Sequence, residues 1–166
     1  MPSRSFELEP AEQISVSTIG EPGQRQFFLL ASGAGEHVTL ACEKFHVEGL
    51  VTRIRQLLEA HGLPSSPPEG GSSGALAGEP DWRIAELGLG YHEERRQFVI
   101  VAREQVEGEQ EAATARLWTG PEEIRRFLHQ AAEVLTSGRP TCPRCGLPMD
   151  PSGHPCPALN GSRPVF

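Results

Sequence analysis

The alternation of apolar and polar residues divides the chain into two halves with the same order of predicted elements. In the first half, strand patterns cover residues 14–19, 26–31 and 38–42, with turn-forming residues between them. A helix follows, because the next apolar residues recur at helical spacing and fall on one stripe. These residues are Leu50, Val51, Ile54, Leu57 and Leu58. Gly62 and Pro64 are predicted to end this helix.

The second half repeats this order. Strands are predicted over 82–91, 98–102 and 113–118. The first of them should contain a bulge near Glu86, because its apolar positions change sides there. The helical stripe that follows consists of Ile124, Phe127, Leu128, Ala131 and Leu135.

Both halves therefore predict strand-strand-strand-helix, and we expect one α+β domain. Residues 1–61 form the first half and residues 81–138 the second half of the same domain. Residues 62–80 form a flexible loop between them, since Gly, Pro and Ser fill 13 of its 19 positions. We expect a mostly antiparallel sheet of about six strands, with both helices on one face to cover its apolar side.

The tail, residues 139–166, has a different composition and predicts a small zinc knuckle. Seven prolines and few large apolar side chains lie between residues 140 and 166, so this segment cannot fold by burying a core. It nevertheless contains the pattern C-x2-C-x8-H-x-C. Three thiolates and one imidazole form a tetrahedral ligand set suited to Zn²⁺. The predicted ligands are Cys142, Cys145, His154 and Cys156.

Alternatives to this metal site remain open at the level of sequence. Asp150 could replace His154 as the fourth ligand, because one residue between His154 and Cys156 is a tight spacing. Disulfides are less favoured, because the three tail cysteines would need Cys42 to complete two pairs. With four protein ligands the zinc would be structural, since a catalytic zinc keeps an open position for water.

Charge and hydropathy narrow the possible partners. The 166 residues include 15 Lys and Arg against 22 Asp and Glu, a formal net charge of -7, and no basic stripe is visible. Nucleic acid is therefore an unlikely partner. No apolar run is long enough to span a membrane, and the N-terminus lacks a signal-peptide pattern. We expect a cytoplasmic protein.

Several short motifs resemble a bacterial family known as domain of unknown function 3090. The similar segments are residues 20–27, 81–83, 138–146, 150–154 and 160–161. The resemblance implies a cytoplasmic protein of about this length that ends in a zinc knuckle. It also implies genes encoding a phosphoinositide-kinase-like and a histidine-phosphatase-like protein nearby. It supplies no catalytic residues.

A metal site without a catalytic constellation favours a non-enzymatic binding or adaptor module with a protein partner. One alternative is a hydrolase or transferase whose pocket lies between sheet and linker and uses Arg25, Asp81 or His92. A weaker alternative is nucleic-acid binding through arginines of the tail. These are Arg139, Arg144 and Arg163.

Overall fold

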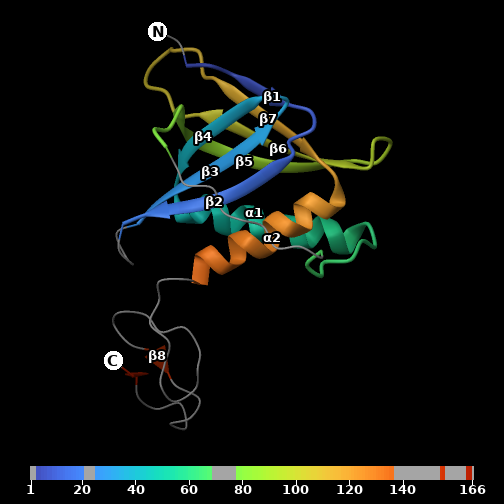
Figure 1. Ribbon diagram of the computed structural model, residues 1–166. Helices are drawn as coiled ribbons and strands as arrows, with labels where there is room; N and C mark the ends of the chain where they lie inside the picture. The colour runs from blue at the N-terminus through green and yellow to red at the C-terminus, as the bar shows by residue number, and fades with distance from the viewer. Residues whose placement is uncertain (1–2, 21–24, 69–77, 137–153, 156–163, 166) are drawn as a thin grey trace.

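The computed structural model describes residues 3–20, 25–68 and 78–136, together with the backbone of residues 154–155 and 164–165. Two helices and seven strands form the main body, and a separate two-stranded ladder lies in the tail (Figure 1). The elements are β1 (Phe6–Leu8), β2 (Gln13–Ile19), β3 (Gln26–Gly33), β4 (Glu36–Cys42), α1 (Lys44–Ala60), β5 (Trp82–His92), β6 (Gln97–Glu104), β7 (Thr114–Thr119), α2 (Pro121–Thr136), β8 (His154–Pro155) and β9 (Pro164–Val165).

The main sheet has seven strands in the order β1-β7-β6-β5-β4-β3-β2. It is mixed, because β1–β7 and β4–β5 are parallel pairs while the other four neighbouring pairs are antiparallel. The expectation of six mostly antiparallel strands is corrected in two ways. It omitted β1, whose three residues are too few to show an alternating pattern. It also omitted the parallel β4–β5 contact, in which Leu40 pairs with Trp82 and Ala41 with Arg83.

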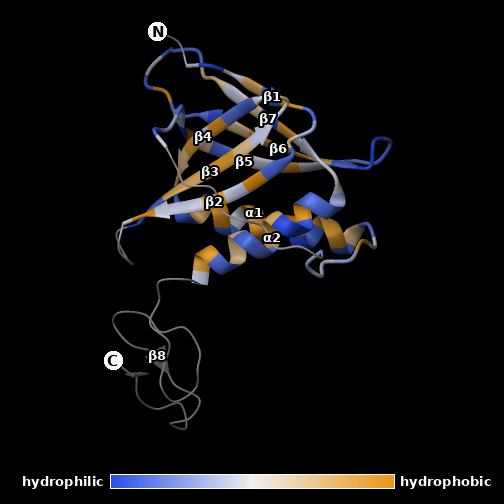
Figure 2. Ribbon diagram, in the orientation of Figure 1, coloured by the Kyte–Doolittle hydropathy of each residue, from blue (hydrophilic) through white to orange (hydrophobic). Residues whose placement is uncertain are grey.

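The predicted helices and their buried stripes are confirmed. All five apolar stripe residues of α1 are buried, as are Ile124, Phe127, Leu128 and Ala131 of α2. Leu135, the fifth residue of the predicted α2 stripe, is partly buried against the core. Both halves contribute to one hydrophobic core, and both helices lie on the same side of the sheet (Figure 1). Figure 2 shows hydrophobic residues along the strands and polar residues in the β5–β6 hairpin. The predicted bulge is also present, as a register shift between Ile84 and Glu86.

The sheet is strongly curled, because its two edge strands are neighbours in the sequence. A flat seven-stranded sheet would be about 29 Å wide, whereas the four residues between β1 and β2 reach at most about 17 Å. Backbone hydrogen bonds fix this connection to both sides, from Ala11 N to Trp118 O (2.7 Å) and from Glu12 N to Ser32 O (2.8 Å). Gly33 lies beneath it, and a Cβ atom there would collide with the carbonyl oxygen of Pro10.

The curled sheet is filled by its two helices in a reciprocal arrangement. Helix α1, from the first half, packs against β5, the first strand of the second half. Helix α2, from the second half, packs against β2, the first long strand of the first half. The helices also pack against each other. Each half therefore covers a strand of the other, which creates two helix–strand boundaries.

Candidate functional site

The boundary between α1 and β5 exposes a strand edge. Strand β5 pairs with β6 from Ile84 to His92, but it pairs with β4 only at Trp82 and Arg83. Beyond those two positions, no second strand lies against β5 within the described residues. In an antiparallel pair alternate residues direct their backbone groups away from the partner strand. The β4 side of β5 therefore presents backbone groups that β6 does not use.

Helix α1 runs alongside this edge in the same direction and is attached near both ends. His46 Nε2 lies 3.1 Å from Ala85 O, and the rings of His61 and Tyr91 lie 4.3 Å apart. Fifteen helical residues advance about 22 Å, and six strand residues advance about 20 Å. The helix and the strand therefore advance by nearly the same distance between the two contacts.

His46 is held rigidly because both of its ring nitrogens are bonded. The backbone N–H of Glu43 donates to Nδ1 (3.0 Å), so Nε2 carries the proton that is donated to Ala85 O. The residue is buried, with 8% of its surface exposed. A backbone bond from His46 N to Glu43 O (3.1 Å) also closes the first turn of α1. The His46 ring thereby fixes this turn to the bulge in β5.

A groove of about 560 Å³ lies between the helix and the strand edge. We call it the α1–β5 groove. One wall is a helical stripe of α1, and the other is five consecutive residues of β5. The lining residues are Phe45, His46, Gly49, Leu50, Arg53, Ala85, Glu86, Leu87, Gly88 and Leu89.

The walls of this groove are open and largely apolar. Gly49 and Gly88 line the groove without side chains, and a Cβ atom at either would have no neighbour within 4 Å. Phe45 lies outside the apolar stripe of α1, and 65% of its surface is exposed. The groove therefore offers an aromatic ring, three leucines and exposed backbone to a binding partner.

Two opposite charges line the groove without neutralising each other. Within the described part of the chain, neither Arg53 nor Glu86 forms an ion pair. Both side chains are exposed. An approaching ligand meets one cation and one anion that it can pair with.

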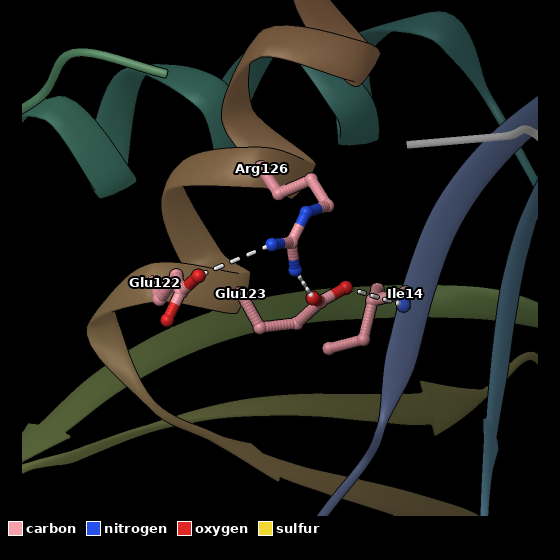
Figure 3. Close-up of polar contacts among 4 residues, drawn as sticks. All are labelled: Ile14, Glu122, Glu123 and Arg126. Carbon is pink, nitrogen blue, oxygen red and sulfur yellow. Dashed lines mark hydrogen bonds and ion pairs between the residues drawn. The ribbon is translucent and has the colours of Figure 1, made fainter. Parts of the chain in front are cut away.

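The second boundary, between α2 and β2, is closed by hydrogen bonds instead. Gln130 bonds both backbone groups of Val16, accepting from its N–H and donating to its carbonyl at 2.8 Å each. Glu123 accepts from the N–H of Ile14 (3.2 Å) while Arg126 holds its carboxylate (Figure 3). Three edge groups of β2 are thus bonded by α2, whereas α1 bonds one edge group of β5. The α1–β5 edge is the more available of the two.

The predicted metal ligands fall mostly outside the described residues. Cys142, Cys145 and Cys156 lie there, as do Asp150 and the three tail arginines. His154 belongs to β8, where its backbone pairs with Val165. Among the described residues, no group of three or more His, Cys, Asp or Glu could hold a metal ion. The zinc site stays a prediction.

The three residues suggested for an enzymatic pocket have other surroundings. Asp81 extends the β4–β5 junction, where its carboxylate accepts from Thr39 N (2.9 Å) and its N–H donates to Thr39 O (2.7 Å). Arg25 donates to Val134 O (3.3 Å). His92 lies 6.1 Å from the ring of Trp118. None of the three lines the α1–β5 groove or the smaller hollow beside β2–β4.

Cys42 is a free, buried cysteine at the end of β4, as the sequence suggested. Desolvation by burial raises the pKa of its thiol to about 12, and the nearby Glu43 carboxylate adds to this effect. The thiol is therefore protonated and unreactive near neutral pH.

Sequence reasoning missed the residues that form the groove. Two signals were present: Phe45 is a large apolar residue off the helical stripe, and Gly49 interrupts the interior of a helix. Neither signal identifies the opposite wall, because the adjacency of α1 and β5 depends on the topology of the whole sheet.

Comparison with known proteins identifies the family. The sequence model described as protein of unknown function (DUF3090) matches residues 6–156. The chain belongs to this family. No curated protein and no solved structure matches the DUF3090 chain. The match includes both helices and both walls of the groove. In this DUF3090 protein, no described helix is both long and apolar enough to cross a membrane.

Proposed function

We propose that this DUF3090 protein is a non-enzymatic, cytoplasmic adaptor that docks a protein partner in the α1–β5 groove. The observation that carries the proposal is the strand edge of β5, which lies open in a 560 Å³ groove while the equivalent edge of β2 is bonded by α2. Strand edges and apolar grooves are recurring docking surfaces for partner segments.

A structural zinc ion in the tail is part of this proposal. Cys142, Cys145, His154 and Cys156 would hold it, and the support is their donor chemistry and spacing. Zinc binding would order a segment that has little apolar surface to bury. Metal analysis of purified protein should give a zinc-to-protein ratio near one, and Cys145→Ser should lower it. A wild-type protein without bound zinc after purification in zinc-containing buffer would refute the metal site.

Docking can be tested by photo-crosslinking in cells. A photoreactive phenylalanine analogue at position 45 is expected to give a discrete adduct, since this side chain is mostly exposed at the groove. The control position is Arg55, which is exposed on α1 but does not line the groove. Equal adducts at both positions, or none at position 45, would contradict docking in the groove.

A further inference from the structure

We propose that the partner segment is an extended peptide that adds a strand to the free edge of β5, with its basic and acidic side chains two positions apart. This inference rests on the proposed docking function and specifies the chemistry of the partner. Its starting point is the backbone of β5 between Glu86 and Leu89, which faces the groove and has no second strand among the described residues.

The shape of the groove selects an extended segment. Its β5 wall consists of five consecutive residues, which extend over about 13 Å of strand. A peptide strand of similar length can pair with that wall, because paired strands have the same rise per residue. Since Gly49 and Gly88 leave open space above the edge, the side chains of an added strand have room there.

Charge complementarity defines the sequence of that segment. His46 and Ala85 are bonded and therefore mark the same level of the groove. Arg53 lies about 10 Å further along α1, whereas Glu86 lies about 3 Å further along β5. The two charges are thus offset by about 7 Å along the groove, which matches the spacing of residues i and i+2 in a strand.

The partner's basic side chain would pair with Glu86 and its acidic side chain with Arg53. Both protein charges are without an ion pair among the described residues, so the partner breaks no existing pair to form these contacts. Apolar side chains next to them would contact Phe45, Leu87 and Leu89.

The test uses two capped peptides, Thr-Val-Lys-Val-Glu-Val-Thr and Thr-Val-Glu-Val-Lys-Val-Thr, and fluorescence anisotropy with the full-length protein. The two charge orders correspond to parallel and antiparallel addition, and one of them is expected to bind. N-methylation of the three valines, which lie between and beside the charged residues, removes their backbone N–H donors but keeps all side chains. It should weaken binding at least about tenfold, because the bonds to the β5 edge are lost.

Charge reversal tests the side-chain pairing. Arg53→Glu should weaken binding by about tenfold, and a peptide with Lys in place of Glu should restore it. Arg55→Glu changes the same charge on the same helix outside the groove and should leave binding unchanged. Unchanged affinity after N-methylation would overturn strand addition, as would failure of both peptides to bind.

These outcomes are distinct from those of the docking proposal. A specific crosslink at position 45 combined with no peptide binding would retain the adaptor function and reject strand addition. Loss of the crosslink itself would reject both.

Discussion

Glycine at position 49 makes helix α1 less stable than alanine would, and it lies where a larger side chain would narrow the groove. It lies in the interior of α1, on the exposed side that lines the groove, and a Cβ atom there would have no neighbour within 4 Å. Glycine in a helix interior is less favourable than alanine by about 0.8–1.0 kcal/mol. Because nothing obstructs the added methyl group, Gly49→Ala is expected to stabilise the protein by about that amount.

Gly62, at the end of the same helix, provides a matched control with the opposite sign. It follows the C-cap residue with φ +65°, and it closes a Schellman motif through bonds from Gly62 N to Glu59 O and from Leu63 N to Leu58 O. An alanine there has equal space but must adopt a left-handed conformation, which costs about 1–2 kcal/mol. Gly62→Ala should therefore destabilise the protein.

Urea unfolding followed by circular dichroism measures both effects. The two variants should differ from each other by about 2–3 kcal/mol, and Gly49→Ala should raise Tm by about 2–4 °C. Two shifts of the same sign would refute this account of the helix. A stabilised Gly49→Ala variant would also show that the native glycine leaves stability unrealised at a position where a larger residue would narrow the groove.

Three further outcomes test other parts of the structure. Gln130→Ala should reduce the free energy of unfolding by about 1–3 kcal/mol, because both backbone groups of Val16 lose their partner. Glu133 is exposed on the same helix, so Glu133→Ala should leave the free energy of unfolding almost unchanged in the same urea assay. The pKa of Cys42 is raised from 9.0 to about 12 in the folded state, so the folded protein retains this proton longer than the unfolded chain. Its contribution to stability is complete below pH 9 and is lost as pH rises toward 12, by about 1.4 kcal/mol per unit, and pH-dependent unfolding of wild type against Cys42→Ala should show this difference. Asp81→Ala should destabilise the β4–β5 junction by about 1 kcal/mol, since Thr39 N loses its acceptor, and equal hydrogen exchange at Thr39 in both proteins would contradict this.

The sequence predicted the elements whose signals are local. The stripes of α1 and α2, the three strands of each half, the bulge near Glu86 and the end of α1 at Gly62 all follow from periodicity and from glycine, and all are confirmed. Strand β1 (Phe6–Leu8) was not predicted. Its three residues do alternate between buried and exposed, but three residues cannot establish a period, and the pairing with β7 spans more than 100 positions.

The groove could not be predicted for a different reason. Its walls are local elements that were each identified, but their adjacency depends on the parallel β4–β5 contact, which only two residue pairs form. Phe45 and Gly49 gave a local indication that this face of α1 is unusual. The zinc ligands are the reverse case, since their spacing is a strong sequence signal and three of the four lie outside the described residues.

The reciprocal placement of the two helices means that each half completes the other, much as two subunits do in an exchanged dimer. Expressed separately, residues 1–68 would lack the α2 side chains that bond Ile14 and Val16, and residues 78–166 would lack the histidine that bonds Ala85. The two fragments should therefore reassemble when mixed. In the intact chain, the linker keeps together two halves that each need the other to complete their packing.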